Sequence, residues 1–576
     1  MPGGGLTSTQ VATKDYVVFN QFDTMDTKQS RLAIEPTRLA WCENLQIQGK
    51  HELAAVPPPL AAFQMPGGST VKMWYGFIAG VDGIVMFRAD GSMVVVYNAP
   101  APSTVVLAPA GTFSNPDVTV WEANIILVAD PTSGYVAFSF SSTAPGVPVF
   151  SNQGALSPNI TVTNGGSGYS TPPAVSFSGG SGGGATAAAI VVGGVVTQVQ
   201  LTNAGSGYLA SDVVTVNFGG PGTGAAASAH VWPIFPGYQP TTLAIFSGRV
   251  WLAATRQLSW SGTLGYDDFN LANAAGFTTI KDYDLVHSIT GLRSLNNFLW
   301  IFGDESIKQI GTISVSGATT NFNIVTLSSD VGTTFPQTIS SYNRLVLFAN
   351  NVGVWAVLGS SVEKVSSEMD GIFKTIDFSQ QLSAALSDIY SERVYCLLVR
   401  YIDPLQSRTR SLLLTFQSRV WYVLAQGDNL TAVTTAWLRG TAGSIETWGS
   451  SGPDATQLLA GTGTINFILT TALSHHNKPM MGKRALRAAT SQLLGSSTGT
   501  ITMTIDTENE FDSENYAMAV SGVPTYQWQR TKANGTGIYL GATLKGTVIS
   551  TFQGYFFQGV ILEYQEATAL ASKVSA

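Results

Sequence analysis

Short β-type runs with an aromatic residue near the middle recur along most of this 576-residue chain. A tight polar turn and a second apolar run follow each of them, as in GRVWLAATRQLSWSG (248–262) and NNFLWIFGDESIKQIG (296–311). Trp251, Trp300 and Trp355 mark three successive units. Units of four short strands that recur roughly every 40 to 55 residues are typical of β-propellers, whose sheets bury their faces against one another around an axis. We therefore predict an all-β chain built on an irregular propeller of about six or seven blades.

The composition supports a β-rich fold with many turns. The chain has 60 glycines and is 10% aromatic, but only 11% of its residues are charged, against about a quarter in a typical soluble domain. A disordered chain would be poor in aromatic and β-branched residues. Few charges leave a largely neutral surface, which is typical of surfaces that partner subunits cover. With a net charge of −7, the chain lacks the overall basic character of a protein that binds nucleic acid.

Cysteine content and the N-terminal residues bear on the compartment. Cys42 and Cys396 form no metal-binding or disulfide pattern, and Cys396, within the apolar run VYCLLV, is expected to be a buried free thiol. The opening residues MPGGGLTSTQ lack the basic and apolar regions of a signal peptide. The longest nearly apolar run, 187–196, is roughly half the length of a membrane span. We therefore expect synthesis in the cytoplasm and no membrane insertion by this chain.

A glycine-rich stretch interrupts the propeller pattern and contains its own repeat. The turn sequence NGGSGY, ending at Tyr169, recurs as NAGSGY, ending at Tyr208, and each copy precedes an alternating run of β-branched residues. Glycine permits the turns, β-branched residues favour the strands, and the two tyrosines are expected to pack over their turns. A flexible Gly/Ser linker is the alternative, but linkers lack this regular alternation. We predict a small inserted β domain of two repeats.

These shifts in composition divide the chain into four parts. We expect an N-terminal segment leading into the first blade at 1–60, propeller blades at 61–150 and 233–473, the inserted β domain at 151–232, and a β-rich C-terminal domain at 474–576. The last domain opens with basic residues and continues with strand-like runs such as TGTITMTIDTEN and FQGVILEYQEA.

The most acidic stretch carries carboxylates at alternate positions. They are Asp506, Glu508, Glu510, Asp512 and Glu514. Clustered carboxylates are ligands for Ca²⁺, but the EF-hand loop requires glycine at its sixth position, where this chain has Phe511. A solvated or lumen-facing loop is the favoured interpretation, and no metal site is predicted.

One local basic run lies at the start of the C-terminal domain. It consists of Lys478, Lys483, Arg484 and Arg487. Proteins that bind single-stranded nucleic acid interleave such cations with stacking aromatics, which are absent from this run. An ionic contact with an acidic neighbouring subunit is therefore the favoured interpretation.

Residue patterns that could support catalysis all have simpler structural explanations. The pairs Asp267–Asp268 and Asp304–Glu305 could serve as the two carboxylates of a glycosidase, yet both follow apolar strands at turns, where aspartate is common. The adjacent His475 and His476 point in different directions on an extended chain, so a turn is favoured over a metal site. The glycine-rich stretch lacks the lysine of a phosphate-binding loop, and no GxSxG nucleophile motif stands out. We predict no catalytic, cofactor or metal site.

Several segments resemble the tail nozzle, or tail-hub, proteins of short-tailed bacteriophages, the family that includes the packaged-DNA stabilisation proteins. The segments are WCENLQIQGKHELAAVPPPLA, AIFSGRVWLAATRQLSWSGTLGYDDF, SLNNFLWIFGDESIKQIG, NRLVLFANNVGVWAV, KPMMGKRALRAA and GVILEYQEA. The first is similar to the family's segment before its first blade, the next three to consecutive blade strands, and the last two to its C-terminal platform domain.

The resemblance implies a structural protein of the virion tail, made in the host cytoplasm. It implies a homo-hexameric tube below an adaptor ring, which retains the packaged genome, conducts double-stranded DNA during ejection and docks tail fibres or a tip protein. The family has no catalytic residue or cofactor. A negatively charged or neutral lumen would not hold DNA by phosphate contacts, so DNA could slide. The acidic stretch from Asp506 to Glu514 is then a candidate for the lumen or a gate.

Two other functions remain open from the sequence. The first is a propeller that binds or cleaves carbohydrate, with Asp267 or Asp304 in its site. The second is a fibre-docking adaptor, in which the insertion around 164–218 is the attachment site.

Overall fold

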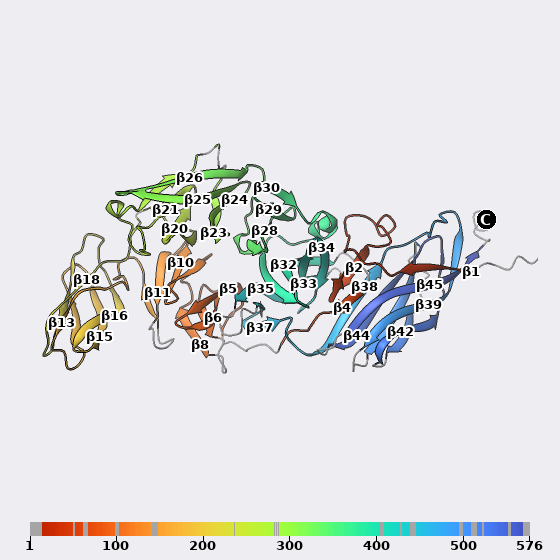
Figure 1. Ribbon diagram of the computed structural model, residues 1–576, viewed down its shortest axis with the longest axis horizontal. Coiled ribbons are helices and arrows are strands. Elements are labelled where there is room, and N and C mark those ends of the chain that lie inside the picture. Colours follow the sequence, from red (N-terminus) through yellow and green to blue (C-terminus); the bar gives the residue numbers. More distant parts are fainter. Residues whose placement is uncertain are drawn as a thin grey trace, which may run out of the picture.

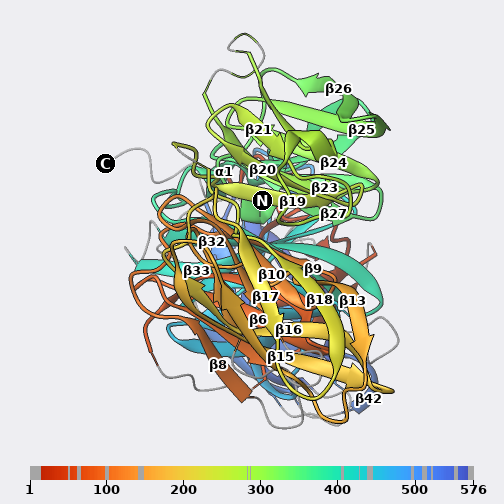
Figure 2. The ribbon, with the colours of Figure 1, turned by 90° about the vertical axis from the view of Figure 1, so that its left-hand side faces the viewer.

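The computed structural model describes most of the chain. The described residues are 14–49, 52–60, 67–97, 103–140, 148–235, 237–281, 283, 285, 287–403, 408–426, 429–437, 445–494, 499–508, 515–520, 523–550 and 555–567. Within them the molecule is almost entirely β-structure, arranged along one long axis. Figure 1 shows the insertion at one end, the propeller in the middle and the C-terminal domain at the other end. Figure 2 views this axis from the end where the insertion lies.

The propeller consists of antiparallel sheets whose strands follow one another in chain order. The first four blades are β5 (Thr70–Ile78), β6 (Val81–Arg88), β7 (Met93–Tyr97) and β8 (Ser103–Ala108); β9 (Asp117–Trp121), β10 (Ile125–Asp130), β11 (Gly134–Ser139) and β12 (Val149–Ser151); β19 (Thr242–Phe246), β20 (Arg249–Ala254), β21 (Gln257–Trp260) and β22 (Gly276–Thr279); and β23 (Ile289–Leu295), β24 (Phe298–Gly303), β25 (Ile307–Ser316) and β26 (Thr319–Ser328).

The remaining blades follow in the same way. They are β27 (Ser340–Tyr342), β28 (Leu345–Ala349), β29 (Val354–Leu358) and β30 (Ser361–Lys364); β31 (Ser383–Ile389), β32 (Glu392–Asp403), β33 (Arg408–Gln417) and β34 (Val420–Leu424); and β35 (Leu430–Trp437), β36 (Ile445–Ser451) and β37 (Asp454–Leu458). The described residues thus form seven blades, the upper of the two predicted numbers. Short helices η1 (Leu271–Asn273), η2 (Pro336–Thr338), η3 (Ser367–Met369) and α1 (Asp370–Phe373) lie in the connections.

The ring closes between the last and the first blade without a strand from the other end of the chain. Trp448 of the last blade packs in one buried cluster with Met73 and Ile84 of the first. The backbone N–H of Leu60 donates to Gln457 at the edge of β37, at 2.9 Å. The seventh blade has three described strands, so the edge of β37 is not covered by a fourth strand. The N-terminal segment covers this edge instead.

Aromatic residues fill the contacts between blades. Trp251 lies in the buried cluster that joins the third and fourth blades, and Trp300 lies in the cluster that joins the fourth and fifth. The indole N–H of Trp251 donates to the Phe246 carbonyl at 3.1 Å, and that of Trp300 donates to the Leu295 carbonyl at 3.0 Å. Each tryptophan thus fixes the turn before its own strand and also packs on the next blade.

The insertion is a six-stranded sheet in the order β13-β18-β17-β14-β15-β16, which confirms a folded β domain rather than a linker. Its strands are β13 (Thr161–Ser167), β14 (Ala174–Ser178), β15 (Gly183–Val192), β16 (Val195–Ser206), β17 (Val214–Phe218) and β18 (Thr223–Ala229).

The repeated turn of the insertion has a direct structural explanation. The side chains of Asn164 and Asn203 each accept a hydrogen bond from the backbone N–H two residues later, at 2.9 Å, which is the Asx-turn geometry. Tyr169 and Tyr208 are buried. A Cβ atom on Gly182 would lie only 2.5 Å from the Tyr208 ring, so the glycine-rich loop gives the tyrosine room to pack.

The C-terminal domain, here called the platform, is built from both ends of the chain. Its strands are β1 (Lys14–Phe19), β2 (Leu39–Glu43), β3 (Leu45–Gln48), β4 (Glu52–Ala55), β38 (Gly463–Thr471), β39 (Gly482–Leu494), β40 (Gly499–Thr507), β41 (Asn515–Val520), β42 (Val523–Lys532), β43 (Thr536–Gly537), β44 (Leu540–Ser550) and β45 (Tyr555–Ala567). The expected division at 1–60 and 474–576 differs from this arrangement. Residues 14–55 contribute four strands to the platform, whose C-terminal part begins at Gly463.

One continuous sheet connects the propeller to the platform. Its order is β31-β32-β33-β34-β2-β38-β44-β40-β41, so the sixth blade runs on through β2 into the platform. β2 pairs in parallel with β34 at Glu43 and Val423, and antiparallel with β38. The second platform sheet, β3-β4-β45-β39-β42, carries β1 on β45 and β43 on β39.

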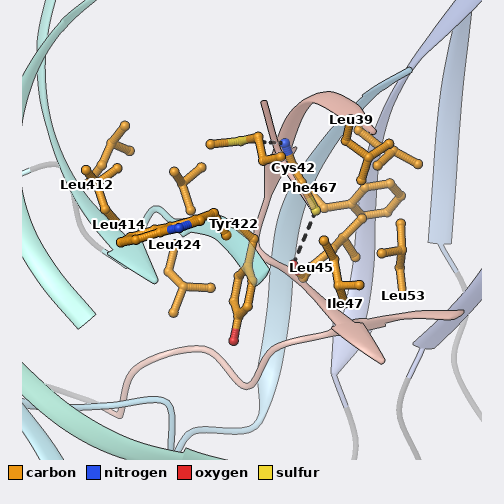
Figure 3. Packing of buried hydrophobic residues seen from close by; sticks show 14 of the residues in the cluster. Leu39, Cys42, Leu45, Ile47, Leu53, Leu412, Leu414, Tyr422, Leu424 and Phe467 are labelled. Atoms are coloured by element: carbon orange, nitrogen blue, oxygen red, sulfur yellow. Dashed lines mark hydrogen bonds between the residues drawn. The ribbon is translucent and has the colours of Figure 1, made fainter. Parts of the chain in front are cut away.

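A single hydrophobic core spans this connection. Leu412, Leu414 and Tyr422 of the sixth blade pack with Cys42 of β2 and Phe467 of β38 (Figure 3). This shared cluster of buried apolar side chains couples the sixth blade to the platform. Both cysteines are buried and free, as predicted for Cys396, and burial raises the pKa of the Cys396 thiol to about 12.

Candidate functional site

A cavity of about 650 Å³ lies on the propeller axis and is lined by the innermost segments of all seven blades. These segments are β5, β9, β19, β23, the region of η2 and β27, β31 and β35. We call it the axial cavity. Most of the residues that line it are apolar, and the charged residues among them are Lys72, Asp117 and Arg293.

These three residues and Thr242 form one buried cluster, here called the Asp117 cluster. The Asp117 carboxylate accepts from Thr242 Oγ1 at 2.6 Å and from Arg293 Nη1 at 2.8 Å. Lys72 Nζ lies 3.7 Å from the other carboxylate oxygen and donates to the Pro116 carbonyl. Each member stands on the inner strand of a different blade, so the cluster ties four consecutive blades together.

The charges of the Asp117 cluster do not cancel, because two cations share one carboxylate. Burial lowers the pKa of Lys72 to about 8, despite the opposing effect of Asp117. Burial alone would raise the pKa of Asp117, but the charges of Arg293 and Lys72 outweigh it, and the net direction is down. Asp117 is therefore ionised at neutral pH, and the cluster carries an excess positive charge.

Sequence reasoning missed this cluster. Lys72 in the run VKMWY is a charged residue in an otherwise apolar strand, which is the one signal that could have marked it. Asp117 and Arg293 are separated by 176 positions, and only closure of the ring brings them together.

The acidic stretch is partly described, and both of its described members serve contacts within the chain. Asp506 pairs with Arg31 at 2.6 Å and accepts from Thr543 Oγ1 at 2.7 Å. Glu508 accepts from the backbone N–H groups of Ile538 and Tyr539, at 2.6 and 2.8 Å. These two carboxylates hold the platform together. Glu510, Asp512 and Glu514 lie outside the described residues.

Two of the four cations in the basic run are engaged in contacts within the chain, and the other two are exposed. Lys478 bridges Asp15 and Glu566 at 2.9 and 2.5 Å. Lys483 is fully buried, and its ammonium group donates to three backbone carbonyls at 2.7 to 3.1 Å. Lys483 therefore cannot meet another subunit, because its charge is enclosed by its own domain. Arg484 and Arg487 are exposed on β39, and the predicted subunit contact rests on these two.

The first carboxylate pair considered for carbohydrate chemistry is engaged in structure. Asp267 is buried and accepts from Ser157 Oγ, and it lies 2.8 Å from His230 Nε2. Ser157 and His230 belong to the two chain segments that connect the insertion to the propeller, so Asp267 fixes that joint. Asp268 accepts from the Asn270 backbone N–H at 2.9 Å.

The second pair and the two histidines show no shared site. Asp304 lies 2.5 Å from His287 Nδ1, and its carboxylate also accepts from the backbone N–H of Glu305 at 3.1 Å. His475 stacks edge-on against Tyr539 with ring centroids 5.5 Å apart. His476 lies 4.0 Å from Asp15.

Neither a metal-binding group nor a helix of membrane-spanning length and hydropathy occurs in the described part of the chain. Three or more His, Cys, Asp or Glu residues nowhere gather there in a group that could hold a metal ion. None of the helices in that part is long and apolar enough to cross a membrane.

Comparison with known proteins adds only distant structural similarity. No family model and no curated protein matches the chain. Among solved structures, the WD40 β-propeller domain of Doa1 is 8% identical, with a TM-score of 0.32 over 70% of this chain and 96% of that one. Raptor from Chaetomium thermophilum is also 8% identical, with a TM-score of 0.34 over 70% of this chain and 30% of that one. The propeller assignment therefore rests on the closed ring of sheets described above.

Proposed function

We propose that this chain is a structural virion protein that forms the tail nozzle of a short-tailed bacteriophage. Six copies form a tube that retains the packaged genome, conducts DNA during ejection and docks an adaptor ring and the tail fibres or tip protein. The observation that carries the proposal is the nine-stranded sheet that joins the sixth blade to the platform. It joins the propeller to the platform by backbone pairing, which suits the subunit of a tube.

The distribution of charge supports a structural role. The chain has few charged side chains, and many of them tie segments together: the Asp117 cluster joins four blades, Asp267 fixes the insertion, and Lys483 and Glu508 brace the platform. Catalytic carboxylates need access to substrate, whereas Asp267 and Asp304 are engaged by neighbouring side chains. The carbohydrate alternative gains no support from these contacts.

The exposed arginines of β39 offer a test of the assembly. In the proposed tube, Arg484 and Arg487 contact an acidic surface of the neighbouring subunit, so reversing both charges should break the ring. We expect wild-type protein to sediment as a hexamer and Arg484→Glu/Arg487→Glu to sediment as smaller species. Arg344→Glu, an equally exposed arginine in the fifth blade, serves as the matched control and should remain hexameric.

Two results would count against this assignment. Wild-type protein that stays monomeric at all concentrations, and never joins tail particles, would contradict the nozzle itself. A double variant that assembles as well as Arg344→Glu would contradict the role of β39 in the contact.

A further inference from the structure

A second cavity, of about 900 Å³, opens at one end of the axial cavity. We call it the mouth cavity. The two cavities meet at Lys72 and Gln337, which line both. The mouth cavity is formed by the ends of β5 and β6, the segment before β9, and parts of the sixth and seventh blades. Its volume lies in the range of about 300–1,000 Å³ that is common for small-molecule sites.

Every charged side chain that the structure places in the lining of the mouth cavity is a cation. They are Lys72, Arg88, Arg400 and Arg410. The other lining residues are neutral, with several Ser, Thr, Asn and Gln side chains among them. The whole chain carries a net charge of −7, so this lining runs against the overall charge of the protein.

The four cations are not equally neutralised. Arg410 is paired with Glu43, with N–O distances of 2.8 and 3.3 Å. Lys72 shares Asp117 with Arg293. Arg400 is exposed at the rim. Arg88 lies near the Asp90 carboxylate and Arg400 near that of Asp377. Neither aspartate lines the cavity, so the charge that faces the cavity is positive.

Arg88 carries the argument furthest. It is only 7% exposed, and its Nε and Nη2 atoms have no hydrogen-bond partner. The Thr70 hydroxyl, which is fully buried in the same lining, also lacks a partner. Buried guanidinium and hydroxyl groups almost always have partners, and burying them without one is costly. An anion held in the cavity would supply hydrogen-bond acceptors for these groups.

We propose that the mouth cavity binds a small, multiply charged oxyanion, of the phosphate or polycarboxylate type, through Arg88, Lys72 and Arg400. The planar guanidinium of Arg88 matches two oxygens of such a group, and Lys72 contributes a point charge. Binding requires the Arg88 side chain to turn toward the cavity, because the two unpartnered nitrogens are closed to water in the free protein. The site does not depend on the nozzle proposal, since it lies within one chain.

The experiment is a calorimetric titration of the full-length chain with inorganic phosphate and, separately, with citrate, each at constant ionic strength maintained with chloride. We expect saturable binding of at least one of the two anions. Arg88→Gln should weaken it by about tenfold or more, because a hydrogen bond to a charged group is worth roughly 1.5–3 kcal/mol. Arg400→Gln should weaken it by a few-fold.

Controls separate loss of the site from loss of the fold. Arg344→Gln removes an exposed cation away from the mouth cavity and should bind like wild type. Arg400 is exposed, so its variant keeps the test valid even if Arg88→Gln folds poorly. Phosphate binding without citrate binding, or the reverse, with weakened binding in both variants, would support the proposal and name the anion class. Heats that match a chloride titration for both anions, or unchanged affinity in Arg88→Gln and Arg400→Gln, would overturn it.

Discussion

Replacing Asp117 by asparagine tests whether the propeller is held together at its axis by one shared carboxylate. The substitution preserves the size of the side chain and its ability to accept from Thr242, but it removes the negative charge that Lys72 and Arg293 share. Breaking a buried ion pair from one side typically costs about 3–5 kcal/mol, because an uncompensated charge remains.

The structure places the expected cost at the lower end of that range. The pKa of Lys72 is already lowered to about 8, so at pH 7 the ammonium can release its proton for about 1.4 kcal/mol and relieve part of the repulsion. We therefore expect Asp117→Asn to lower the free energy of local opening of the inner strands by about 3 kcal/mol. Adding Lys72→Met to this variant should restore stability, since it removes the second cation.

Hydrogen–deuterium exchange measures the free energy of opening of each strand separately. A local measurement is needed because a chain of several domains does not unfold in one step. Amides of 70–78, 117–121, 242–246 and 289–295 should exchange about a hundredfold faster in Asp117→Asn, since 1.4 kcal/mol is a factor of ten. Glu122→Gln, in the exposed turn after β9, is the control and should exchange like wild type. Exchange that is unchanged in Asp117→Asn, or made faster still by Lys72→Met, would refute the reasoning.

Three further predictions concern Lys72, His230 and Lys483. Because folding lowers the pKa of Lys72, the unfolded chain holds the proton more tightly, so the stability of the inner strands should rise with pH between about 8 and 10.5; hydrogen exchange in Lys72→Met should lack this rise. Burial alone would lower the pKa of His230, but its bond to Asp267 outweighs this and raises the pKa. Protection of 157–160 should thus fall as the pH rises above about 6.5, the ordinary pKa of histidine, and His230→Gln should abolish that change. Lys483→Met leaves three buried carbonyls without a donor and should lower the free energy of unfolding of the platform, measured by urea titration, by at least about 2 kcal/mol, against under about 0.5 kcal/mol for Arg484→Gln.

Local sequence signals were enough to predict the elements and the insertion. The strand–turn–strand units around Trp251 and Trp300 depend on residues close in sequence, and their indole bonds reach back only five positions. The repeated turn at Asn164 and Asn203 likewise closes on its own backbone. Such features follow from side-chain type and spacing alone.

Features that depend on distant pairing could not be predicted. Nothing in the sequence around Cys42 indicates that this segment forms a strand between blade six and the platform. The Asp117 cluster draws on four blades, and Asp267 was interpreted as a turn residue although it also fixes the joint of the insertion. Lys483 appeared in a basic run that suggested an exposed patch, but its strand turns it inward to the carbonyl of Ile538.

Electron microscopy of the purified full-length chain, classified for rotational symmetry, tests the proposed nozzle most directly. The account predicts a six-fold ring with an open centre, in which the platform and the propeller of each subunit keep the relative positions seen in Figure 1. A population of isolated elongated monomers, unchanged on mixing with tail particles that lack this chain, would contradict it.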